Sequence, residues 1–211
     1  IAFCAKAAAS AEGDLTGAGG GLLCANYDAG SVAVLPAISD VAGTATAAGT
    51  TADDFAGALG APTSAKHVTP GAEATVEGSR QDASHPHGIF VDPSEKWALA
   101  CDLGSNVIVV HSLPLGGGGG LAANPAPPTR LHAGAGPRHL VFHPGGKQCF
   151  CVNELDNTVS AFTFDAETGA LSPEEVGTWS TLPADWLATD PCVHHVYYYG
   201  RLPAFPPSPF V

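Results

Sequence analysis

The sequence predicts an all-β protein assembled from repeats of one small antiparallel unit, and three observations lead to that prediction. The 211 residues include 26 glycines and 18 prolines, a density that leaves little room for long amphipathic helices. Short runs rich in β-branched and aromatic residues follow clusters of turn-forming residues. One stretch of the chain also recurs 51 residues further on without a gap.

Three stretches of the chain are expected to hold the strands, namely residues 22–38, 86–112 and 137–165. Within the last two, the runs VIVV and VSAFTF each follow a turn cluster, DLGSN in the first case and NELDN in the second. Gly, Asn and Asp accept the left-handed backbone conformations that tight hairpins require. Two further turns are expected at residues 92–96 and 143–147, so each stretch divides into short strands joined by hairpins.

The connecting segments differ in composition from the strand-rich stretches. Residues 41–78 and 114–136 are low-complexity inserts rich in Ala, Gly, Thr and Pro, and we expect them to form loops. Residues 187–211 contain the runs HHVYYYG and LPAFPPSPFV, and we expect a divergent, irregular tail there.

The repeat identifies the architecture. Residues 86–93 (PHGIFVDP) align on residues 137–144 (PRHLVFHP), and the match continues through the next turn and strand. A weaker third copy, residues 23–35, resembles residues 150–162. A four-stranded unit that returns every 40–50 residues or so is typical of β-propeller blades, and this chain has room for about three to four of them. The alternative is a chance similarity between two proline-containing hairpins.

Composition and charge exclude several classes of function. The chain has 8 Lys and Arg against 20 Asp and Glu, a net charge of −12, so it lacks the basic surface that nucleic acids and anionic membranes require. No apolar window is long enough for a transmembrane helix. The six cysteines are widely and irregularly spaced, which favours reduced thiols in an intracellular protein over a disulfide scaffold.

Four segments together resemble the seven-bladed β-propeller lactonase family, whose members include a bacterial-type 6-phosphogluconolactonase and a fungal carboxymuconate cyclase. They are ANYDAGSVAVLP at residues 25–36, RQDASHPHG at 80–88, GAGPRHLVFHP at 134–144 and CVNELDNTV at 151–159. The resemblance covers about residues 22–38 and 78–186. It implies an incomplete propeller, about three to four blades of a seven-bladed ring, with low-complexity loops.

The resemblance also implies that later blades should follow Trp186, and the sequence does not continue into them. We therefore interpret residues 1–186 as a partial propeller and the chain as an N-terminal fragment, in agreement with its first residue, Ile1, and its lack of Met. A truncated ring leaves apolar surface and sheet edges open, so association is expected. The oligomeric state itself is not predicted. A cytoplasmic location is expected, or an organelle if a transit peptide has been lost.

The repeat places His87 on Arg138, and equivalent positions in neighbouring blades face one central channel. The resemblance implies that these two residues and Glu154 form the catalytic group, and we select His85, His139 and Asn26 as candidate substrate-binding residues. In the expected hydrolysis of a small anionic lactone, Glu154 acts as general base toward water. Arg138 stabilises the oxyanion or holds the anionic group, and His87 protonates the leaving oxygen.

Alternative interpretations remain open at this point. A carboxymuconate-type cyclase would use the same groups in reverse, and a non-catalytic scaffold would not bring them together. Arg138 and Glu154 would then be a structural ion pair. No cofactor and no metal site are expected, and neither nucleic acid nor membrane is expected as a partner.

Overall fold

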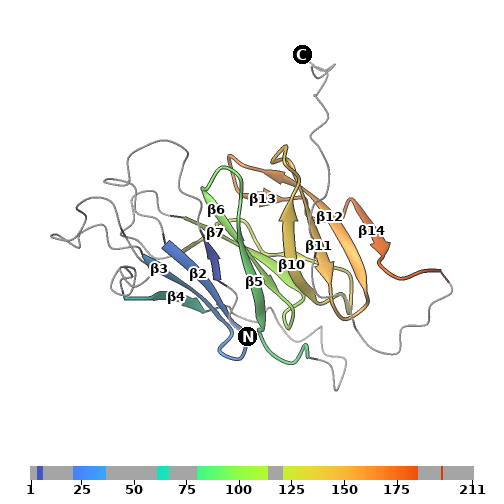
Figure 1. Cartoon of the computed structure of the whole chain (residues 1–211), viewed down its shortest axis with the longest axis horizontal. Coiled ribbons are helices and arrows are strands. Elements are labelled where there is room, and N and C mark those ends of the chain that lie inside the picture. Colours follow the sequence, from blue (N-terminus) through green and yellow to red (C-terminus); the bar gives the residue numbers. More distant parts are fainter. Residues whose placement is uncertain are drawn as a thin grey trace, which may run out of the picture.

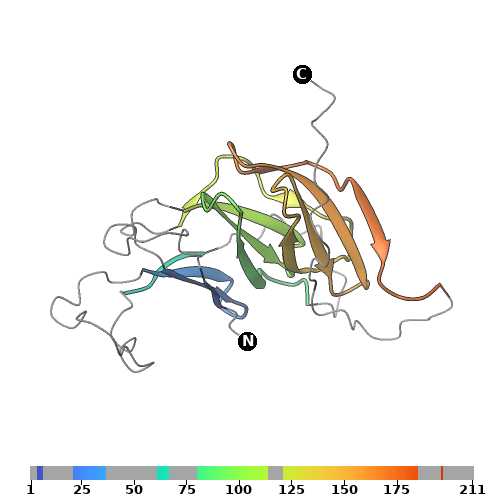
Figure 2. The same cartoon turned by 45° about the horizontal axis from the view of Figure 1, so that its top comes forward.

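The computed structural model describes residues 4–6, 21–36, 61–66, 80–113, 121–184 and 196. These residues form three antiparallel sheets and no helix, which confirms the all-β prediction. The sheets follow one another in chain order across the molecule (Figures 1 and 2). No helix among the described residues is long and apolar enough to cross a membrane.

Each sheet is built from strands that neighbour one another in sequence. The first contains β1 (Cys4–Lys6), β2 (Gly21–Asn26), β3 (Ser31–Pro36) and β4 (Thr63–Lys66), in that order. The second contains β5 (Pro86–Val91), β6 (Trp97–Asp102), β7 (Val107–Ser112) and β8 (Ala122–Ala123), with β9 (Thr129–Arg130) also paired to β7. The third contains β10 (Pro137–Phe142), β11 (Gln148–Asn153), β12 (Thr158–Asp165) and β13 (Ala170–Leu171), with β14 (Gly177–Ser180) paired to β12.

The 51-residue repeat is confirmed strand by strand. β5, β6 and β7 begin 51 residues before β10, β11 and β12, and both first pairs carry an irregularity after their opening proline. The turn after the second strand contains a left-handed residue at the same place in every sheet: Gly30 (φ 60°), Asn106 (φ 57°) and Asn157 (φ 57°). Glycine and asparagine tolerate this conformation best, and so they fix the register of each hairpin.

Apolar side chains between neighbouring sheets form the core. Leu23 and Val32 of the first sheet pack with Ile89 of the second. Cys101 of the second sheet meets Cys151 of the third with their sulfurs 3.9 Å apart. Cys149 is also fully buried in this layer, so the three cysteines occupy buried strand positions.

The outer strands are the part of the fold that the sequence analysis missed. β4, β8 and β9 lie in segments that were expected to be loops, and β14 follows the last expected strand-rich stretch. These strands have two to four residues and expose most of their side chains, so they lack the run of apolar residues that marks an inner strand. Of the expected tail, residues 187–211, only Val196 lies among the described residues.

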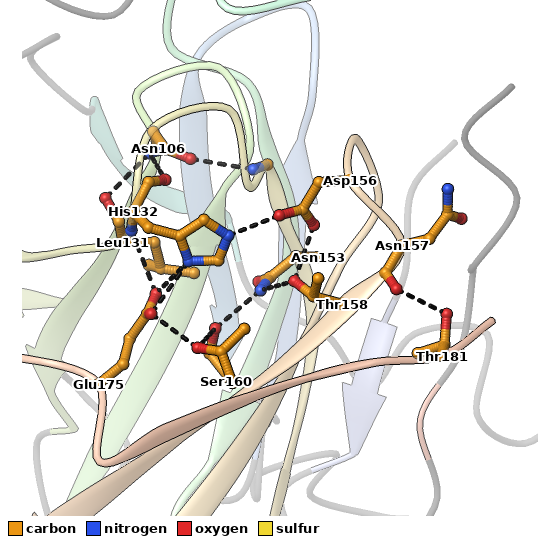
Figure 3. Close-up of polar contacts among 12 residues, drawn as sticks. Asn106, Leu131, His132, Asn153, Asp156, Asn157, Thr158, Ser160, Glu175 and Thr181 are labelled. Atoms are coloured by element: carbon orange, nitrogen blue, oxygen red, sulfur yellow. Dashed lines mark hydrogen bonds and ion pairs between the residues drawn. The ribbon is translucent and has the colours of Figure 1, made fainter. Parts of the chain in front are cut away.

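A polar network fastens the third sheet to the segment that enters it (Figure 3). His132, between β9 and β10, is hydrogen-bonded at both ring nitrogens. Nε2 contacts the Asp156 carboxylate, and Nδ1 contacts Glu175 at 2.8 Å. Thr158 donates to Asp156 at 2.7 Å and Thr178 donates to Glu175 at 2.8 Å. One imidazole therefore ties the β11–β12 turn to the segment that precedes β14.

The far face of the third sheet is less covered than the equivalent face of the first. Trp179 pairs with Val159 across β14 and β12, so both side chains point to this face. Trp179 is 56% exposed, and Val159 is half-buried, whereas Val32 at the equivalent place in the first sheet is completely buried. The second sheet covers Val32, and no described residue forms a sheet over Val159.

Candidate active site

The first strands of the second and third sheets place the site. β5 and β10 lie side by side (Figure 1), and each carries a candidate side chain at its second residue, His87 in β5 and Arg138 in β10. Glu154 is the first residue after β11, where the chain turns back toward β12. The structure thus brings together the three residues that the sequence analysis predicted to be catalytic.

Glu154 is the centre of the cluster. Its Oε2 accepts a hydrogen bond from Nε of Arg138 at 2.9 Å and lies 3.6 Å from Nε2 of His87. Its Oε1 forms an ion pair with Nη2 of Arg80 at 2.8 Å. Glu154, Arg138 and His87 are buried, whereas the side chain of Arg80 is 46% exposed. Each carboxylate oxygen is therefore held by a different guanidinium, one from inside the protein and one from the solvent side.

This geometry sets the charge states of Glu154 and His87. Burial disfavours the ionised form of Glu154, but the hydrogen bond and charge of Arg80, together with the charge of Arg138, outweigh it and lower the pKa of the carboxyl. Burial also disfavours a charged His87, and the charge of Arg138 acts in the same direction, so the pKa of His87 falls to about 4. At neutral pH the site holds a carboxylate and a neutral imidazole.

Tyr27, in the turn between β2 and β3, brings the first sheet into the site. Its ring stacks on the His85 ring, with 4.4 Å between centroids, and meets His87 edge-on at 5.4 Å. Its hydroxyl is buried beside Arg80, and burial raises its pKa. His85 is held in turn by Asp82 at 3.2 Å and by the backbone oxygen of Tyr27 at 3.1 Å.

The other two candidate binding residues lie differently. The ring of His139 is buried and packs edge-on against His87, with 5.8 Å between centroids, and against Phe90. Asn26 donates a hydrogen bond to the Ser31 hydroxyl at 3.3 Å, across the turn between β2 and β3. Asn153 makes the equivalent bond to Thr158 in the third sheet, so the contact of Asn26 is a repeated feature of the turn.

Sequence reasoning missed two members of the cluster, Tyr27 and Arg80. A signal for Tyr27 was present, because the third copy of the repeat aligns Tyr27 with Glu154. Arg80 precedes β5 and its counterpart 51 residues later is Leu131, so the repeat gives no signal for it. Among the described residues, no group of three or more His, Cys, Asp or Glu side chains is arranged to hold a metal ion.

Comparison with known proteins agrees with this architecture. The family model "Lactonase, 7-bladed beta-propeller" matches residues 5–193. A 6-phosphogluconolactonase of Pectobacterium carotovorum is 37% identical over 103 residues, which cover 49% of this chain and 30% of the relative. A 6-phosphogluconolactonase of Bacillus subtilis is 29% identical over 166 residues, which cover 78% of this chain and 40% of the relative.

A solved structure shows the same fold. The periplasmic gluconolactonase of Pseudomonas aeruginosa superposes with a TM-score of 0.58 at 26% identity, over 79% of this chain and 41% of that protein. The chain thus spans well under half the length of the relatives it matches. Three consecutive four- to five-stranded sheets, a 51-residue repeat and a family match over most of the sequence lead to one conclusion. This chain belongs to the seven-bladed β-propeller lactonase family.

Proposed function

We propose that the protein to which this chain belongs hydrolyses a small anionic sugar lactone, with 6-phosphogluconolactone as the substrate and 6-phosphogluconate as the product. One observation carries the proposal: a neutral, buried His87 lies beside a carboxylate that two arginines hold. Such a site offers a proton acceptor next to concentrated positive charge, as ester hydrolysis requires. The names of the relatives from Pectobacterium and Bacillus support the same reaction.

The electrostatics favour different roles for Glu154, His87 and the arginines in this reaction. Both oxygens of Glu154 are bound by guanidiniums, so we assign this carboxylate to orienting Arg138 and His87, in place of the general-base role expected from the sequence. His87 is neutral at physiological pH and can accept a proton from the attacking water. Water then bonds to the lactone carbonyl carbon while the arginine charge stabilises the oxyanion. The ring C–O bond breaks, and the proton held by His87 passes to the departing ring oxygen.

The reaction is tested on the complete protein with 6-phosphogluconolactone. Arg138→Ala removes the charge that stabilises the oxyanion, and we expect kcat to fall by at least ~10²-fold. Arg130→Ala, which removes an exposed cation of β9, is the matched control and should retain activity. Hydrolysis by the wild-type protein together with full activity of Arg138→Ala would overturn the role of Arg138. Turnover of carboxymuconate alone would identify a cyclase. If the protein turned over neither carboxymuconate nor 6-phosphogluconolactone, it would be a scaffold.

We further propose a cytoplasmic location and a place in the oxidative pentose phosphate route. The free, buried thiols of Cys101, Cys149 and Cys151 support a reducing compartment. Fractionation of source cells with an antibody against the chain tests this, and recovery with secreted or periplasmic proteins would contradict it.

A further inference from the structure

We propose that Arg80 recognises the anionic group of the substrate and makes the site selective for a phosphorylated lactone over an uncharged one. The inference rests on the lactonase function proposed above and adds a specificity residue to it. It starts from a difference between the two arginines on Glu154. The side chain of Arg138 is 7% exposed, whereas that of Arg80 is 46% exposed. Arg80 therefore forms the solvent-facing side of the cluster.

Arg80 is held in position before any ligand arrives. Its Nη2 is fixed by Oε1 of Glu154 at 2.8 Å, and the Tyr27 hydroxyl lies beside the same guanidinium. The Tyr27 ring is itself held by stacking on His85. Partial burial opposes the charge of Arg80, but the hydrogen bond and charge of Glu154 outweigh it and raise the pKa of the guanidinium. A rigid, permanently charged group loses little conformational entropy when it binds an anion.

Arg80 has more hydrogen-bond donors than its contacts with the described residues use. A guanidinium carries five N–H donors, and among the described residues Glu154 and Tyr27 are the groups that Arg80 meets. With half of the side chain exposed, the remaining donors can reach a ligand from the solvent side. The planar fork of arginine fits two oxygens of a phosphate at once, which a lysine cannot do.

The local charge fits an anion and contrasts with the rest of the chain. Arg80 and Arg138 carry two positive charges, Glu154 carries one negative charge, and His87 is neutral at physiological pH. The cluster is thus cationic in a chain whose net charge is −12. Phosphate monoesters and carboxylates share the oxyanion chemistry that this cluster recognises. A phosphate carries more charge and one more oxygen, so we assign the phosphate group to Arg80.

The test compares two substrates that differ only in the phosphate, 6-phosphogluconolactone and glucono-δ-lactone. In the complete protein, Arg80→Gln should lower the ratio of their kcat/KM values by at least ~10-fold, mainly through a higher KM for the phosphorylated lactone. Arg80→Lys keeps the positive charge but loses the planar guanidinium that can bind two oxygens. It should therefore give a ratio between those of the wild type and Arg80→Gln. Arg130→Gln removes an exposed arginine outside the cluster and should keep the wild-type ratio.

Several outcomes overturn the inference while the lactonase function stands. An equal loss on both substrates would mean that Arg80 only positions Glu154, and an unaltered ratio would mean that another group binds the phosphate. If the protein hydrolyses neither lactone, calorimetry with inorganic phosphate and 6-phosphogluconate still decides the question. Weaker binding of both anions by Arg80→Gln would support the assignment, and equal binding, or no binding by the wild type, would overturn it. Thermal melts of every variant confirm that it is folded.

Discussion

Glu154 is held by two arginines, one at each carboxylate oxygen, and their charges add to the effect of burial that keeps His87 neutral. The charge of Arg138 lowers the pKa of His87, and that of Arg80 contributes in the same direction, whereas the charge of Glu154 raises it. Burial has the largest effect of all. The surroundings therefore keep the imidazole neutral down to a lower pH than a free side chain, and they lower its basicity by the same amount.

We predict that Arg138→Gln raises the pKa of His87 from about 4 toward the ordinary value of 6.5 without reaching it, because the effect of burial remains. Titration of the His87 imidazole by NMR in the wild type and the variant measures this shift. Arg130→Gln is the control, because Arg130 is an exposed residue of β9 outside the cluster around His87. A value for His87 that is the same in wild type and Arg138→Gln would contradict the assigned electrostatics.

Acid should weaken the fold through the same residue. The folded pKa of His87, about 4, lies below its unfolded value of 6.5. His87 therefore contributes stability above pH 6.5, and that contribution is lost as the pH falls through about 4. Urea denaturation of the wild type and of His87→Asn at several pH values between 4 and 7 should show a shallower acid dependence in the variant. Parallel curves for the two proteins would refute the prediction.

The sequence contains enough to predict the residues that the repeat relates to one another. His87 and Arg138 occupy the same strand position, so a propeller whose blades repeat every 51 residues brings them near one axis. The place of Glu154 in the site was inferred from the family resemblance. Arg80 could not be predicted in this way, because it lies in a connecting segment whose position depends on tertiary packing. Tyr27 had an alignment signal, but an aromatic residue in a turn is also a common structural feature.

At the scale of strands and turns, close backbone contacts are the tightest constraint. A Cβ on Gly104, in the turn after β6, would lie 1.8 Å from the backbone oxygen of Ala83 and 2.7 Å from the His85 ring. We predict that Gly104→Ala lowers the free energy of unfolding by about 2–3 kcal/mol and disturbs the site through His85. Gly134 is the control, because a Cβ there meets nothing within 4 Å and only its φ of 78° costs energy. Equal stability losses in urea for the two variants would contradict the steric explanation.

The His132 network gives a second prediction at this scale, with the opposite dependence on pH (Figure 3). Partial burial opposes protonation, but the hydrogen bonds to Asp156 and Glu175 outweigh it and raise the pKa of His132. The stabilisation is therefore full below the unfolded pKa of about 6.5 and is lost as the pH rises through the folded pKa. His132→Gln should lower Tm by about 2–4 °C more at pH 6 than at pH 9. A Tm loss independent of pH in calorimetry would contradict this.

The inner strands were predictable and the outer strands were not, for a physical reason. β5, β6, β10 and β11 each pack against a neighbouring sheet, so burial selects apolar residues that can be read directly from the sequence. Strands such as β8 (Ala122–Ala123) have two exposed residues and are held by pairing with β7. Pairing uses backbone groups that every residue except proline has, so it leaves almost no trace in composition.

For the whole molecule, the third sheet presents an apolar face that the first two sheets bury. Trp179 is 56% exposed and Val176 is 55% exposed, both in the segment that ends the third sheet. We predict that the 211-residue chain produced by itself associates at micromolar concentration, and that Trp179→Asp weakens this association. Ala122→Asp, on the exposed β8, is the control. Sedimentation velocity measures the effect, and a monomer at every concentration would contradict it.

The unbroken period of the second and third sheets has a practical consequence for engineering. Pro86 and Pro137 open their sheets in the same way, so a cassette of residues 86–136 begins and ends at equivalent junctions. A second copy inserted in frame after Gly136 would therefore meet a native-like neighbour at each seam. The number of sheets could therefore be varied by copying one segment of the gene.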